Sequence, residues 1–73
     1  MSTYTVTMQF LDASGRRVGE YHEEFTATGD EEDAVECARF VVCEEGDTYP
    51  VAVSVDYEVW AGERLINQDT IEA

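Results

Sequence analysis

Two segments of this chain alternate strictly between apolar and polar residues. Apolar side chains occupy every second position of residues 3–12, and residues 50–60 repeat the pattern in a valine-rich form. A period of two is typical of a strand with one buried face, because successive side chains point to opposite sides. The predicted inward residues are Tyr4, Val6, Met8 and Phe10, and then Val51, Val53, Val55, Tyr57 and Val59. We therefore expect a sheet with one covered face.

A second strand is predicted over residues 17–27, after a turn with Gly15 at its tip. Its inward positions are Tyr21 and Phe25, and its outward positions are Glu20, His22 and Glu24. Glu23 also falls on the inward side. A carboxylate at such a position indicates an edge strand or a β-bulge.

Residues 28–46 have the periodicity of an amphipathic helix. Thr28 or Asp30 is expected to cap it, since Thr28 with Glu31 matches a capping box. The acidic residues that follow lie in the first turn, where they meet the positive end of the helix dipole. Gly46 is expected to end the helix. The predicted buried stripe contains Ala34, Cys37, Ala38 and Val41, flanked by Val35 and Val42.

The predicted order of elements is β-β-α-β-β, closed by a turn at residues 61–64 and a short strand at residues 65–67. The two clearest alternations are expected at the centre of the sheet, and the more charged strands at its edges, where charge discourages aggregation. A right-handed crossover then gives one α+β domain over residues 1–73. It is a four-stranded antiparallel sheet in order 2-1-3-4 with one helix on one face, and the other face stays open to water.

The formal net charge is −13, from 17 carboxylates and four arginines, and the chain has no lysine. Because 44% of its residues are hydrophobic, it is expected to fold despite this self-repulsion. Nucleic acid and anionic membranes carry the same sign, so neither is an expected partner. The expected partner is a basic surface on another protein.

Carboxylates two residues apart on a strand lie on one face, about 6.6 Å apart. This spacing is comparable to that of phosphates along a nucleic-acid strand, and the acidic start of the helix adds a second group. The predicted surrogate phosphates are Glu20, Glu24, Glu31, Glu32, Asp33, Glu36, Asp56 and Glu58. The alternative is a solubility surface or an acidic coat adapted to a salty cytoplasm. The excess of Glu over Asp (11 against 6), two cysteines and eight aromatic residues argue against salt adaptation.

Glu20, His22 and Glu24 share one strand face and form a candidate divalent-metal site. The alternative is an exposed histidine with acidic neighbours that arise by chance in so acidic a chain. The segment "GDEEDAVE" lacks the spacing of a calcium-binding EF-hand loop. The sequence shows no nucleophile–base set and no glycine-rich phosphate loop. No enzymatic activity, metal or cofactor is therefore predicted.

Cys37 and Cys43 are the only cysteines. On one helix they are about 9 Å apart along the axis, beyond the roughly 7 Å that a disulfide spans. Reduced thiols, a cytoplasmic location and a monomer are therefore expected. The start "MSTYTVTMQF" predicts neither a signal peptide nor a membrane span. Phe40 and Trp60 fall on outward positions, where they either anchor an interface or, for Trp60, cover the sheet edge.

A short, lysine-free, strongly acidic chain opening "MSTYTVTMQFLDASGRRVGEYHEEF" resembles the small anti-CRISPR proteins of phages and mobile elements. It is most similar to those directed at type I systems, with type I-C preferred. The resemblance lies in length and charge and carries no functional residue over by position. It implies an inhibitor that binds the type I surveillance complex (Cascade) on the basic surface that reads PAM or target DNA. The alternatives are a DNA mimic directed at a restriction enzyme, a nucleoid protein or another DNA-binding defence protein, and a small halophilic domain.

Overall fold

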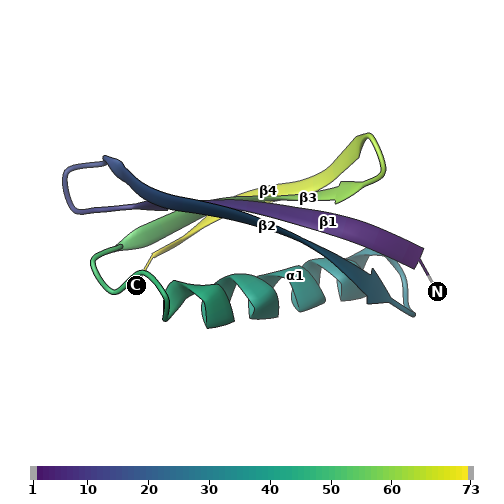
Figure 1. Ribbon diagram of the computed structural model, residues 1–73. Coiled ribbons are helices and arrows are strands. Elements are labelled where there is room, and N and C mark those ends of the chain that lie inside the picture. Colours follow the sequence, from purple (N-terminus) through teal and green to yellow (C-terminus); the bar gives the residue numbers. More distant parts are fainter. Residues whose placement is uncertain (1, 73) are drawn as a thin grey trace.

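The computed structural model describes residues 2–72, which form four strands and one helix (Figure 1). The elements are β1 (Ser2–Leu11), β2 (Arg17–Ala27), α1 (Glu31–Gly46), β3 (Ser54–Ala61) and β4 (Arg64–Glu72). Neighbouring strands are antiparallel, and their order in the sheet is β2-β1-β3-β4. The helix lies along one face, as Figure 1 shows. The predicted α+β fold, its order and its strand arrangement are confirmed.

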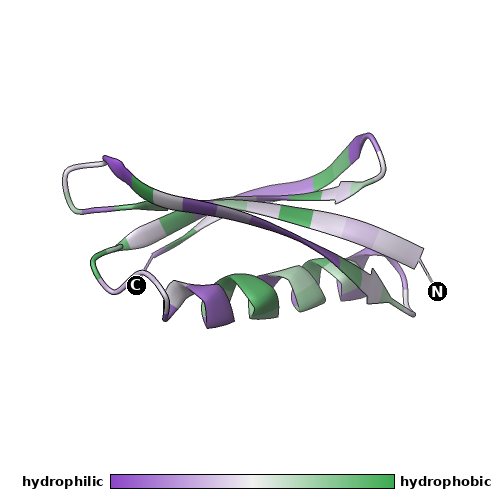
Figure 2. Ribbon diagram, viewed as in Figure 1, coloured by the Kyte–Doolittle hydropathy of each residue, from purple (hydrophilic) through white to green (hydrophobic). Residues whose placement is uncertain are grey.

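The core lies between the central strands and α1. The buried strand residues are Tyr4, Val6, Met8 and Phe10 on β1 and Val55, Tyr57 and Val59 on β3. The register places Val6 opposite Val59 and Met8 opposite Tyr57, so the two apolar rows form one continuous layer. Figure 2 shows this alternation as apolar bands between polar ones along the strands. The inward positions predicted for β1, and for β3 from Val55 onward, are confirmed.

The helix approaches the sheet through small side chains. Ala34, Ala38 and Val42 are buried, and Val41 is half-buried. The predicted stripe was wrong at Cys37, which is exposed. The line of contact follows successive i, i+4 positions, and Cys37 lies off that line. Because alanine has no side chain beyond Cβ, the helix axis can lie close to β1 and to its neighbours β2 and β3.

Both ends of α1 are defined by local hydrogen bonds. Asp30 is the N-cap, and its carboxylate accepts a hydrogen bond from the Asp33 amide at 3.1 Å. Of the two predicted caps, Thr28 is therefore not the one used. The helix ends at Gly46, as predicted, and the Asp47 amide donates to the carbonyl oxygens of the last turn. The acidic first turn lies at the positive end of the helix dipole, as expected.

The strand predicted over residues 50–60 begins later, at Ser54. Successive turns occupy the preceding segment: the Tyr49 amide donates to the Gly46 carbonyl at 3.1 Å, and the Ala52 amide to the Tyr49 carbonyl at 3.0 Å. Val51 and Val53, predicted to face inward, are therefore 66% and 43% exposed. An alternating run of valines does not reveal that turn hydrogen bonds compete for its backbone.

The last strand, predicted over residues 65–67, extends over Arg64–Glu72. It pairs with the whole of β3, from Ala61 opposite Arg64 to Ser54 opposite Glu72. Its centre is polar and has a low strand propensity, so pairing with β3 rather than local preference determines its length. Ile66 and Ile71 are its contributions to the core.

Glu23 lies on β2, an edge strand, and is half-buried. Its carboxylate accepts a hydrogen bond from the Tyr21 hydroxyl at 3.2 Å. The pairing of β1 with β2 is regular there and shifts only between Phe10 and Leu11. Of the two predicted explanations, the edge position is therefore correct and the bulge is not.

Candidate functional site

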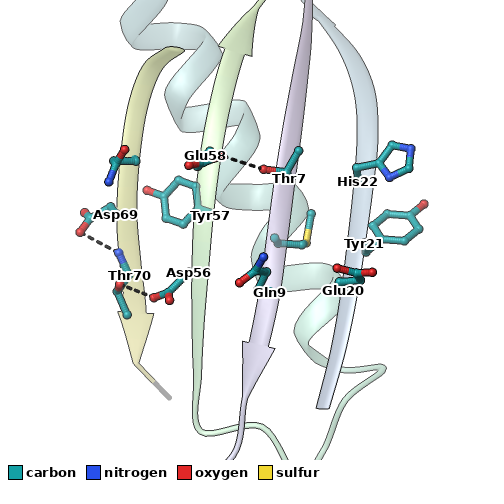
Figure 3. Close-up of a pocket in the computed structure, with 12 residues that line it drawn as sticks. Thr7, Gln9, Glu20, Tyr21, His22, Asp56, Tyr57, Glu58, Asp69 and Thr70 are labelled. Carbon is teal, nitrogen blue, oxygen red and sulfur yellow. Dashed lines mark hydrogen bonds between the residues drawn. The ribbon is translucent and has the colours of Figure 1, made fainter. Parts of the chain in front are cut away.

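The sheet face opposite α1, here called the open face, carries the outward side chains of all four strands. The register aligns them in rows across the sheet. One row contains Glu20, Gln9, Asp56 and Thr70, and the next contains His22, Thr7, Glu58 and Gln68. Figure 3 views this face with the helix behind the strands. The strands bring together acidic residues that are far apart in the sequence.

A shallow hollow of about 1050 Å³ lies over these two rows. The strands twist relative to one another, as Figure 1 shows, so the face is curved and not flat. Hydroxyl, amide and carboxylate groups form most of the outward lining, and Asp56 and Glu20 stand on opposite sides of β1 (Figure 3). Their strands are two inter-strand spacings apart, or about 10 Å. The hollow is thus a broad anionic surface and not a closed pocket.

Neighbouring donors orient three of the four carboxylates that were predicted for this face. Asp56 accepts a hydrogen bond from the Thr70 hydroxyl at 2.6 Å. Glu58 accepts one from the Thr7 hydroxyl at 3.5 Å and one from the Trp60 indole at 3.3 Å. The donors to Asp56 and Glu58 are neutral, so they position the carboxylates without removing negative charge. Glu20, by contrast, pairs with Arg17 at 3.3 Å.

The eight predicted surrogate phosphates do not form one surface. Glu20, Glu24, Asp56 and Glu58 lie on the open face. The other four, Glu31, Glu32, Asp33 and Glu36, lie in the first turns of α1 on the opposite side of the sheet. A single flat ligand cannot contact both groups at once, so the structure divides the predicted array into two separate sites.

Other carboxylates are distributed around the molecule. Glu72 joins the open face, because it pairs with outward-facing Ser54. The sequence prediction missed Glu72 because the last strand was predicted to end at residue 67. The alternation that would have revealed it continues through Gln68, Thr70 and Glu72. Glu44, Glu45 and Asp47 lie at the end of α1. The whole surface is therefore acidic, and the open face differs by its ordered rows and not by exclusive charge.

Two of the four arginines neutralise part of this charge. Arg17 pairs with Glu20 on the open face, and Arg64 pairs with Glu31 at the start of α1. The hydrogen bond to the Glu31 carboxylate raises the pKa of Arg64. Arg64 thus neutralises Glu31, the first of the four predicted carboxylates on α1, here called the helix group. Glu24, Asp56 and Glu58 have no arginine partner among the described ion pairs.

Glu20, His22 and Glu24, the candidate metal site, share the open face, as predicted. Across residues 2–72, no cluster of three His, Cys, Asp or Glu side chains is arranged to hold a metal ion. Cys37 and Cys43 are free and exposed.

The two aromatic residues predicted to face outward have different environments. Phe40 is 67% exposed on the outer side of α1. Trp60 is half-buried, and its indole donates to Glu58. Trp60 thus helps to fix a carboxylate of the open face, which the sequence did not indicate.

No protein-family model matches the chain, and no curated protein or solved structure shows significant similarity to it. Within residues 2–72, α1 has neither the length nor the apolar character of a membrane-crossing helix. The function of the protein must therefore be inferred from the charge and geometry of the open face.

Proposed function

We propose that this protein is a non-enzymatic DNA mimic that inhibits a type I CRISPR surveillance complex. In this proposal the open face occupies the basic surface that reads PAM or target DNA, and Glu20, Glu24, Asp56 and Glu58 take the place of phosphates. The protein acts as a monomer in the cytoplasm of the host bacterium, without metal or cofactor. The observation that carries the proposal is the ordered array of carboxylates on a rigid sheet face.

The energetics of such a contact support this role. PAM-reading clefts and heteroduplex channels are basic, because they hold nucleic-acid backbones. A protein of net charge −13 is attracted to them over long range, which raises the association rate. Carboxylates held by Thr70 and Thr7 lose little conformational freedom on binding, so less free energy is spent in ordering them.

The open face is favoured over the helix group for two reasons. Its carboxylates lie in two lines about 10 Å apart on a sheet, whereas those of α1 point outward around the first two turns of the helix. The helix carboxylates also have a structural role, because they stabilise the positive end of the helix dipole. Mimicry of DNA against another DNA-binding protein uses the same face, and a change of target in the assay below separates the two.

The test is competition between this protein and PAM-bearing duplex DNA for a purified type I surveillance complex. We expect target binding to fall as protein is added at low salt, and the inhibition to weaken as salt rises. Two variants remove four charges each: E20Q/E24Q/D56N/E58Q on the open face and E31Q/E32Q/D33N/E36Q on α1. The open-face variant should inhibit about tenfold less well than the helix variant.

Unchanged target binding at saturating protein and low salt contradicts the proposal for that complex. An equal loss of inhibition in the two variants shows that only the net charge matters, and it contradicts the role given to the open face. Circular dichroism of both variants confirms that they are folded before the comparison.

A further inference from the structure

At one end of the molecule, where α1 stops and β3 begins, the covered edge of the hydrophobic core lies just beneath the surface. A groove of about 230 Å³ lies there, here called the end groove. Its apolar walls include Phe10, Val42, Val53, Val55 and Ile71, and Asp47 stands at its rim. Phe10, Val42 and Val55 belong to the core cluster itself. An apolar side chain that enters the groove would therefore extend the core.

The walls that face solvent are apolar although they lie on a highly charged protein. Val53, which lines the groove, is 43% exposed, and Val51 beside it is 66% exposed. The turns of residues 47–52 hold both valines away from the core, as described above. The end groove therefore exposes a small apolar surface, and Val53 is an accessible part of it.

Of the residues that line the end groove, Asp47 alone is acidic, and it continues an acidic helix end. The last turn of α1 contains no basic residue, and Glu44, Glu45 and Asp47 lie at its end. That end of a helix is negative, so cations stabilise it and carboxylates do not. A cation supplied by a partner would relieve this repulsion.

We propose that the end groove receives a large apolar side chain flanked by arginine or lysine on a basic protein partner. The volume fits one such side chain, because a cavity of about 150 Å³ already admits benzene. It lies below the roughly 300–1,000 Å³ of small-molecule sites. A second copy of this chain would bring a further charge of −13 to the same rim, which opposes self-association.

This inference rests on the proposed function in one respect: the basic partner is the protein whose DNA-binding surface the open face occupies. It adds an apolar anchor to an electrostatic contact. Charge then contributes mainly to the rate of association, and the anchor slows dissociation. Because duplex DNA offers no such anchor, the end groove would let the inhibitor compete at salt concentrations that weaken pure charge attraction.

The test uses two peptides of equal charge and the ¹⁵N-labelled protein. Ac-RRLFRR-NH₂ supplies apolar side chains between arginines, and Ac-RRSGRR-NH₂ supplies the arginines alone. We expect the first peptide to shift the amide signals of Gly46, Asp47, Val53 and Ser54 saturably, and the second, which offers charge alone, to shift them much less. Equal shifts with both peptides, or no shift with either, overturn the inference. Shifts that depend on protein concentration without peptide indicate a second copy and also overturn it.

A matched pair of variants locates the effect. Val53→Ser should lower the affinity of the protein for the apolar peptide about threefold, because part of a valine side chain is lost from the contact. Leu65→Ser is the control, since Leu65 is 39% exposed but does not line the end groove. Equal weakening by both substitutions overturns the inference. Neither peptide contains a CRISPR component, so failure of the end groove and failure of the inhibitor give separate negative results.

Discussion

At the scale of single residues, Tyr57 is the least satisfied part of the core. Its ring is buried, and its hydroxyl has no hydrogen-bond partner in the described chain. Burial raises the pKa of Tyr57, while the nearby charge of Arg39 opposes the rise. Asn67 lies nearby, but its side chain makes no hydrogen bond to this hydroxyl. A buried polar group without a partner costs stability, so this hydroxyl does not contribute to the fold.

Tyr57→Phe is therefore expected to raise the free energy of unfolding by about 1 kcal/mol at pH 7. The folded-state pKa lies above 10.0, so the folded protein holds this proton more tightly than the unfolded chain does. Stability therefore does not change with the ionisation of Tyr57 below pH 10, and it falls as the pH rises toward the folded-state pKa. Urea unfolding at pH 7 and at pH 10.5 measures both effects. A variant that is less stable at pH 7 would show that the hydroxyl has a partner.

At the scale of elements, α1 carries acidic residues at both of its ends. Its first turn carries three acidic residues where the helix dipole favours them, and its last turn carries acidic residues where the dipole does not. The N-terminal arrangement stabilises the helix, and the C-terminal arrangement weakens it. The weakened end forms the rim of the end groove, so the same feature that costs local stability favours a cationic partner.

Two substitutions of the same chemistry should therefore have opposite effects. Glu44→Gln removes a carboxylate from the negative end of α1 and should raise the free energy of unfolding by about 0.3–1 kcal/mol. Glu32→Gln removes one from the positive end and should lower it by a similar amount. Both change the net charge equally, so thermal unfolding of the pair at low salt isolates the dipole. Equal changes in both variants would contradict the assignment, because the loss of one negative charge is common to them.

At the scale of the whole molecule, the charge of −13 is confined to a body of 38 × 20 × 16 Å. The screening length is about 30 Å in 0.01 M salt and about 3 Å in 1 M salt. At low salt most carboxylates therefore repel one another across the molecule, and at high salt only adjacent ones do. The folded state tolerates this repulsion because its apolar layer is continuous over the central strands.

The midpoint of thermal unfolding should rise by about 4–8 °C between 0.01 M and 1 M sodium chloride, which corresponds to about 1 kcal/mol for a domain of this size. The open-face variant E20Q/E24Q/D56N/E58Q should respond less, because four charges are removed. Circular dichroism should show a folded protein at 0.01 M salt. Loss of structure there would instead favour a halophilic domain adapted to high salt.

The sequence predicts those parts of the candidate site that depend on alternation within one strand, and not those that depend on pairing between strands. Glu20, Glu24, Asp56 and Glu58 were assigned to one face by alternation alone, and the register confirms it. Glu72 and the donors Thr7 and Thr70 were missed, because their places depend on which residues pair across the sheet. The helix group was assigned to the same array, but the fold places it on the other side.

The sequence by itself determined the covered and open faces of β1, most of β3, and the start and end of α1. These features depend on local geometry: side-chain direction alternates within a strand, and capping groups lie within one turn of the helix end they cap. Only the tertiary structure decided the start of β3, the length of β4, the exposure of Cys37 and the separation of the two acidic groups. The last three follow from pairing and docking between distant segments, and the start of β3 follows from turn hydrogen bonds that the alternation of residues does not encode.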